Sequence, residues 1–487
     1  MSEPPILSVT GGVGGTSMRY AIAQHLATSY DVAGSRMRTW AATGGMAMVD
    51  EEVVQSAVLS PLTFAEAEGA VLRATTGSDG ILVESVGWEA DAVAIRATVG
   101  ALEAADAAVR GMFEAVDYGA GALVGSLAVV GTAAATPTLL TAAVLLGPRA
   151  ANAWQSLPAP LRAELRERAA REAAAGADKL GDWLADHPEV LQHLVNGSGG
   201  LLDGLGAWTS GELHPTTESA AGALASAYTD GRAEVHSRPD LAVGSATSPP
   251  ADLAGLIRHL EETNDLSPIG TPGAEGTIEV QTITDDSGTR HIVYLPGTDD
   301  LTTLPWTQDG DVRDAGTNFL LVADADNSYQ SGILTAMRQA GIEPGEPVLL
   351  AAHSQGGMAA ARILAQGSDF TISQVVTAGS PTAQLPGFPL GSRVLSLENA
   401  GDVVPLLDGE PNPDSAEQVT VRFDAPGASL GDNHDLSRYA AGAAAVDAAD
   451  DPSLVAMLQG MRRVGFLGTQ PDAEVTSQVF QVVRVSP

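Results

Sequence analysis

The stretch from Pro347 to Ala361 restricts the fold more than any other part of this 487-residue chain. Val348 to Ala351 form a short apolar run, which is typical of a buried strand. A turn of small residues follows, and an alanine-rich helical run begins at once. A buried strand that leads directly into a helix indicates a sheet with helices packed against it.

The second half of the chain repeats this alternation of short β-rich runs with helical runs. Ser328 to Gln339 and Gly356 to Gln366 are the clearest helical runs between the strands. Alternation of this kind predicts an α/β fold, with a mostly parallel sheet flanked by helices. The expected strands are Thr277 to Thr284, His291 to Leu295, Phe319 to Val322, Val348 to Ala351, Thr371 to Thr377, Arg393 to Leu397 and Val419 to Phe423.

The first half of the chain has the sequence pattern of an all-α domain. Arg19 to Ala42 and Leu62 to Ala74 contain no proline, and an apolar seam with a seven-residue repeat follows Trp88. Such a seam predicts helices packed side by side. We therefore expect an N-terminal helical domain over residues 1–236, a linker over 237–250 and an α/β domain over 251–487. The seam consists of Ile95, Val99, Leu102, Val109, Phe113 and Val116.

The apolar segment 119–147 lies within this helical half. No charged residue occurs from Tyr118 to Pro148, a length that could span a bilayer. Its Gly, Ala and Thr content and Pro137 also suit a buried helical hairpin, so membrane association stays open beside it. The first residues, Met1 to Met18, lack an ordinary secretory signal. The chain is thus expected to be cytoplasmic, membrane-associated or exported without a signal peptide.

Composition excludes several classes of function. The formal charge is -35, with 60 acidic and 25 basic residues, so nucleic acid is not an expected partner. The chain has no cysteine, which rules out disulfides and thiolate chemistry. The nine histidines show no HxxxH or HExxH spacing, so no metal site is expected.

The turn after the apolar run carries Ser354. A serine on a sharp strand-to-helix turn needs small residues two positions before and after it, and these are Ala352 and Gly356. This stretch resembles the nucleophile elbow of the α/β-hydrolase superfamily, particularly its lipase and esterase branch. Ala352 departs from the usual G-x-S-x-G pattern but keeps the small side chain. The resemblance covers residues 275 to 450 and implies that Ser354 is a nucleophile in an α/β-hydrolase fold.

In this family an acid and then a histidine follow the serine along the chain. Asp402 lies in a turn after the expected strand Arg393 to Leu397, and Glu398 and Asp408 are its local rivals. His434 is the only histidine after Ser354, and it lies just before a helical run. The resemblance implies that His434 is the general base and that Asp402 orients it.

Two backbone amides should bind the oxyanion that forms during attack. The resemblance assigns them to Gln355, next to the serine, and to Thr298, in the turn after the expected strand His291 to Leu295. The function implied is hydrolysis of a carboxylic ester, of a small molecule or a lipid, without a cofactor. Thioesters and amides use the same machinery, so the fold does not choose among them.

A second hypothesis starts from the helical half. Val86-Gly87-Trp88 lies between helical runs and loosely resembles the turn of W-x-G helical-hairpin (type VII) secretion modules, although the triplet itself differs. Under this hypothesis the chain is a secretion-associated effector or an interaction protein, and the hydrolase acts on a lipid, thioester or amide.

Overall fold

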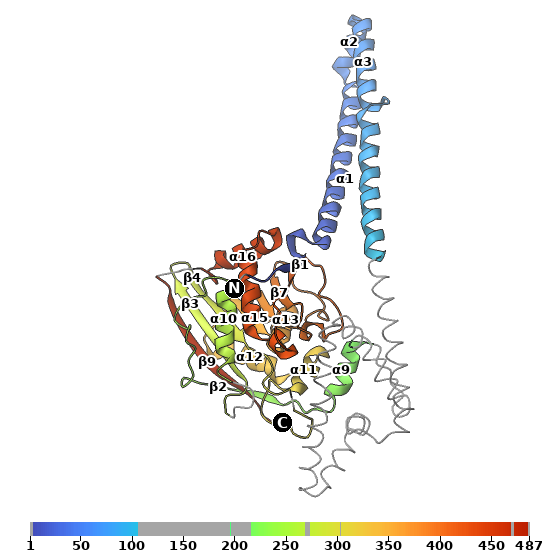
Figure 1. Cartoon of the computed structure of the whole chain (residues 1–487). Helices are drawn as coiled ribbons and strands as arrows, with labels where there is room; N and C mark the ends of the chain where they lie inside the picture. Colours follow the sequence, from blue (N-terminus) through green and yellow to red (C-terminus); the bar gives the residue numbers. More distant parts are fainter. Residues whose placement is uncertain are drawn as a thin grey trace, which may run out of the picture. The chain divides into compact units, whose positions relative to one another are not determined.

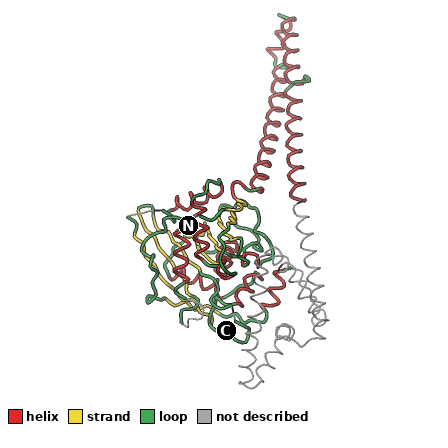
Figure 2. The backbone as a smooth tube through the Cα atoms, in the orientation of Figure 1, coloured by secondary structure: helices red, strands yellow, loops and turns green. Residues whose placement is uncertain are grey.

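The computed structural model describes residues 3–105, 195, 216–267, 273–301, 303–468 and 472–485. These residues belong to two compact units (Figure 1). One is entirely helical, and the other contains a mixed sheet flanked by helices (Figure 2). The broad expectation of an N-terminal helical region and an α/β fold is therefore confirmed.

The helical unit is built on two long antiparallel helices, α1 (Thr16–Ala47) and a helix over residues 81–105. Arg38 pairs with Glu89 and Arg96 pairs with Asp31, so the two helices run in opposite directions. The ring of Tyr30 lies 4.9 Å from that of Trp88. Two shorter helices, α2 (Glu51–Leu59) and α3 (Pro61–Thr76), connect the long ones.

The expected apolar seam is described only in its first part. Val99 is buried, whereas Leu102 is 46% exposed, and the fully buried Ala92 extends the packed stripe. The later seam residues and the apolar segment 119–147 lie outside the described residues. No helix among the described residues is long and apolar enough to cross a membrane.

The sheet of the second unit has nine strands in the order β1-β8-β7-β6-β5-β4-β3-β9-β2. The five central strands, β4 to β8, are parallel, and the pairs on both sides of them are antiparallel. The strands are β1 (Ile6–Gly11), β2 (Arg232–Ser237), β3 (Thr277–Asp285), β4 (Gly288–Leu295), β5 (Pro347–His353), β6 (Thr371–Ala378), β7 (Arg393–Asn399), β8 (Gln418–Phe423) and β9 (Glu474–Val485).

Helices cover both faces of this sheet. Alternate residues of β4 point to opposite faces, with Ile292 and Tyr294 in one apolar core and Val293 and Leu295 in the other. Helices α10 (Leu253–Asn264), α15 (Leu436–Asp447) and α16 (Pro452–Val464) supply the first core. Helices α11 (Ala315–Val322), α12 (Ser328–Gln339) and α13 (Gln355–Gln366) supply the second. Short elements complete the unit: α9 (Thr217–Ala225), α14 (Leu430–Asn433) and the 3-10 turns Gly12–Gly14 and Val404–Leu406.

One expected strand is wrong. Phe319 to Val322 belong to α11, because the side chain of Asp314 caps the start of that helix by accepting the amide of Thr317 at 2.8 Å. A short apolar run fits a buried helix as well as a strand, and the cap decides between them. The other expected strands are present.

The expected division of the chain also needs correction. Strands β1 and β2 both lie before residue 251, yet both pair with the sheet. The segment 238–250 is packed against the same unit rather than linking two domains. Ser245 bonds to Glu262, and the Gln281 side chain donates to the carbonyl groups of Ala246 and Ser248.

Candidate active site

Ser354 lies at the sharp turn between β5 and α13. Its φ of +51° and ψ of −121° are unusual for a residue with a side chain. The following turn of helix passes so close to β4 that a Cβ on Gly356 would lie 2.2 Å from the carbonyl oxygen of Leu295. Ala352 is fully buried on the strand side. The structure thus gives the steric reason for both small residues, and it holds Ser354 in a strained conformation.

His434 and Asp402 come together from loops after β8 and β7. His434 Nδ1 lies 2.6 Å from Asp402 Oδ2. The same carboxyl oxygen accepts the hydroxyl of Tyr439 at 2.5 Å, and the other accepts the amide of Val404 at 2.9 Å. Asp402 is buried, and its charged hydrogen bond to Nδ1 fixes the ring of His434.

The two rival acids take other partners. Glu398 accepts the Asn412 side-chain amide at 2.8 Å, and Asp408 accepts the backbone amide of Ala383 at 2.7 Å. Burial raises the pKa of each to about 7. Of the three candidate acids, Asp402 is the one placed against His434.

His353 supports the turn from behind. Its Nε2 donates to the backbone carbonyl of His434 at 3.0 Å, and the two imidazole rings lie 4.4 Å apart. Burial, and then the neighbouring His434, hold the pKa of His353 well below its usual range. His353 therefore stays neutral and ties the serine turn to the histidine loop.

The two amides expected to bind an oxyanion come from the start of α13 and from the loop after β4. Gln355 is the first residue of α13, where a backbone N–H has no acceptor within the helix. Thr298 follows β4, and its hydroxyl accepts the Asn318 side-chain amide at 3.1 Å. Gly297, between β4 and Thr298, is so close to the serine that a Cβ there would lie 2.9 Å from Ser354 Cβ.

A buried ion pair, which no sequence pattern indicated, holds this loop. Arg313 is fully buried, donates to the carbonyl of Gly297 at 3.0 Å and pairs with Asp299 at 2.6 Å. In the sequence Arg313 looks like part of a charged surface turn, so only the fold reveals its role. Gly379, just after β6, is also close to the site, because a Cβ there would lie 2.9 Å from His434 Cε1 and 3.0 Å from Asp402 Oδ2.

Ser354, His434 and Thr298 line a single cavity of about 810 Å³. A histidine held by a buried carboxylate can accept a proton, and the helix N-terminus at the serine favours negative charge. Most of the wall is apolar. Its larger apolar side chains are Leu224, Leu301, Phe319, Val322, Met358, Val404, Leu407 and Leu436.

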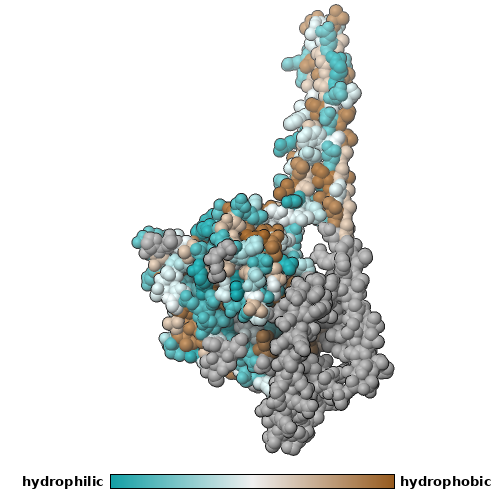
Figure 3. All heavy atoms as spheres, in the orientation of Figure 1, coloured by the Kyte–Doolittle hydropathy of each residue, from teal (hydrophilic) through white to brown (hydrophobic). Residues whose placement is uncertain are grey.

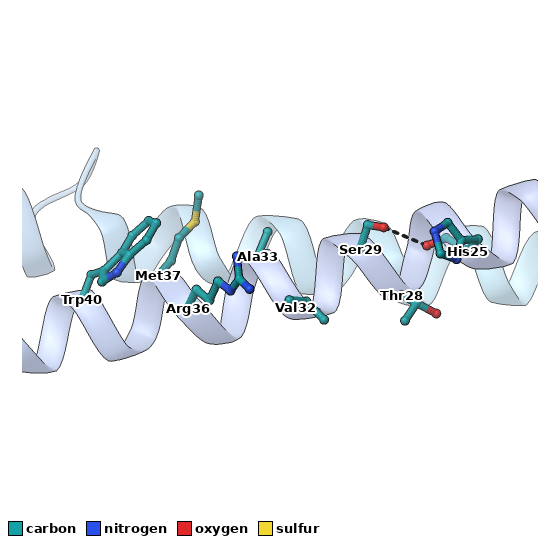
Figure 4. A pocket seen from close by; sticks show the side chains of 8 residues that line it. All are labelled: His25, Thr28, Ser29, Val32, Ala33, Arg36, Met37 and Trp40. Atoms are coloured by element: carbon teal, nitrogen blue, oxygen red, sulfur yellow. Dashed lines mark hydrogen bonds between the residues drawn. The ribbon is translucent and has the colours of Figure 1, made fainter.

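A second hollow, of about 480 Å³, lies along α1 in the helical unit (Figure 4). The described residues that line it all come from this one helix, including His25, Arg36 and Trp40. The bond drawn there joins the hydroxyl of Ser29 to the carbonyl of His25, within the helix. This hollow therefore lacks the convergence of polar groups seen at Ser354.

Among the described residues, no group of three or more His, Asp or Glu side chains could hold a metal ion. Comparison with protein-family models, with curated proteins and with solved structures found no match to this chain.

Proposed function

We propose that the sheet-bearing unit is a serine hydrolase of the α/β-hydrolase type that cleaves a carboxylic ester. The observation that carries the proposal is the 2.6 Å contact between His434 Nδ1 and the buried Asp402, beside a cavity that His434 shares with the strained Ser354. A strand-to-helix turn of this kind and the chain order serine, acid, histidine are both typical of that fold.

In the proposed reaction, Ser354 Oγ attacks the ester carbonyl and His434 takes its proton at Nε2. Asp402 stabilises the imidazolium that forms, and the amides of Gln355 and Thr298 bind the oxyanion. His434 then gives the proton to the leaving alcohol. A water molecule, activated by the same histidine, releases the acid from the acyl-serine.

The test is turnover of p-nitrophenyl butyrate together with labelling by a fluorophosphonate. Ser354→Ala should abolish labelling and lower turnover by about four orders of magnitude or more, because the nucleophile is lost. Ser331→Ala, at an exposed serine of α12, is the matched control and should behave as the wild type. Labelling that persists in Ser354→Ala would refute the assignment of the nucleophile.

A second candidate function, an interaction or secretion module, draws on the helical unit. Its surface shows several apolar patches (Figure 3). Trp40 is 59% exposed, and Val58, Leu59 and Leu62 are more than 80% exposed. Exposed apolar side chains in such number are typical of a surface that meets a partner. Cell fractionation with and without a type VII secretion system tests it, and a chain found in the cytoplasm in both cases counts against it.

A further inference from the structure

The charged side chains in the wall of the Ser354 cavity are all acidic. Glu261, Asp265, Asp299 and Asp435 line it, and no Lys or Arg is among the described residues that do so. Asp299 is neutralised by the buried Arg313. The other three carboxylates have no ion-pair partner within 4.0 Å among the described residues, which leaves the cavity with an uncompensated negative charge.

The surroundings do not offset this charge. Burial raises the pKa of Glu261, and the negative charges of Asp435 and Asp265 raise it further. Arg258 opposes this effect only weakly, because its side chain is 61% exposed and lies 3.8 Å from Asp252. A cation in the cavity would relieve the repulsion among the carboxylates.

His353 adds a buried polar side chain to the wall of the same cavity. It lines the cavity, is 8% exposed and leaves its Nδ1 without a hydrogen-bond partner among the described residues. Because neutral His353 uses its Nε2 proton to bond to the carbonyl of His434, Nδ1 carries a lone pair. Nδ1 is buried and lies 3.0 Å from the position that a Cβ on Gly297 would take, so it packs closely against this glycine.

The position of the carboxylates within the cavity defines which half of an ester they would meet. In a serine hydrolase the histidine must touch the leaving group in order to protonate it. Asp435 follows His434 directly, and its charge acts on Glu261. The acidic side of the cavity is therefore the leaving-group side, while Phe319, Val322 and Met358 are available to an apolar acyl chain.

Building on the proposed ester hydrolysis, we infer that the natural substrate is an ester of a cationic amino alcohol with an apolar acid. The protonated amine lies among Glu261, Asp265 and Asp435, and the acyl chain lies against the apolar wall. Esters whose leaving group carries a phosphate or carboxylate are rejected by the same carboxylates.

The experiment compares two esters of equal shape on the full chain. 3-(Dimethylammonio)propyl butyrate carries the cation on the alcohol, and 4-methylpentyl butyrate replaces its nitrogen with carbon. We expect kcat/KM to favour the cation by roughly tenfold at low salt, and the preference to shrink as salt screens the charges. Propyl 4-(dimethylammonio)butyrate, with the cation on the acyl side, should show no such advantage over propyl 5-methylhexanoate.

Glu261→Gln removes one charge without changing the shape of the side chain, and should lower the preference about fivefold. Asp286→Asn makes the same change of charge at an exposed turn outside the cavity and should leave the ratio unchanged. Hydrolysis of both alcohol esters at equal rates would overturn the inference while leaving the hydrolase intact. Absence of hydrolysis of all four esters, together with absence of fluorophosphonate labelling, would instead overturn the proposed function.

Discussion

Asp402 accepts hydrogen bonds from three groups: the ring of His434, the hydroxyl of Tyr439 and the amide of Val404. Tyr439 is fully buried, and the adjacent negative charge of Asp402 adds to burial in raising its pKa well above the usual range. The hydroxyl therefore stays protonated and always donates. We regard Tyr439 as a positioning residue that fixes the carboxylate behind the histidine.

Tyr439→Phe should lower kcat/KM for p-nitrophenyl butyrate by about ten- to a hundredfold, since a buried hydrogen bond to a charged group contributes about 1.5–3 kcal/mol. The phenyl ring keeps its edge contact with Phe423, so the fold should persist. Tyr294→Phe, at a buried tyrosine that bonds to Gln281, is the matched control. Equal loss of activity in both variants would show that Tyr439 has no special role.

Asp408 provides a pH-dependent prediction. Its folded pKa of about 7 lies above the ordinary value of 3.8, so the folded protein holds the proton more tightly than the unfolded chain. The stability this contributes is present below pH 4 and is lost as pH rises to 7. Asp408→Asn keeps an acceptor for the Ala383 amide and removes the buried charge.

We therefore expect Asp408→Asn to be more stable than the wild type at pH 8, by about 4 kcal/mol at most, and nearly equal to it at pH 4. Urea unfolding at the two pH values measures the difference. Asp286→Asn, at an exposed turn, should show no such trend. A gain that is the same at both pH values would contradict the assigned cause.

At the scale of elements, the turn from β5 into α13 depends on close approach to β4. Gly356→Ala would place a Cβ 2.2 Å from one backbone oxygen and 2.5 Å from another, and neither can move without displacing β4. We expect a loss of at least about 3 kcal/mol of unfolding free energy. Gly222→Ala in α9, whose nearest contact would be 3.8 Å, is the control. Chemical denaturation of both variants measures the unfolding free energy, and an equal loss in the two would contradict the prediction.

The elements that the sequence predicted correctly are those with a strong local pattern. The parallel strands are short apolar runs between helices, and Ser354, Asp402 and His434 stand in a recognisable order. Strands β1, β2 and β9 were not predicted, because each pairs with strands that lie far away in the sequence. Arg313 and Tyr439 were missed for the same reason, since each acts through a contact between distant loops.

At the scale of the whole molecule, the sheet-bearing unit draws on segments that lie before its expected start. A fragment of residues 251–487 lacks β2 and the segment that bonds to Gln281 and Glu262. It should melt at least about 5 °C below a fragment of residues 216–487, or aggregate through the exposed edge of β9. Scanning calorimetry of the two fragments tests this, and equal melting temperatures would show that β2 contributes nothing.

The pairing of β1 with β8 also has a consequence for synthesis. Ile6 meets Phe423 in the sheet, so β1 leaves the ribosome long before its partner exists. At 5–20 residues per second the wait is roughly 20 to 80 seconds. Throughout that time a newly made strand must avoid pairing with other chains, which makes the nascent chain, rather than the finished protein, the state most in need of a chaperone.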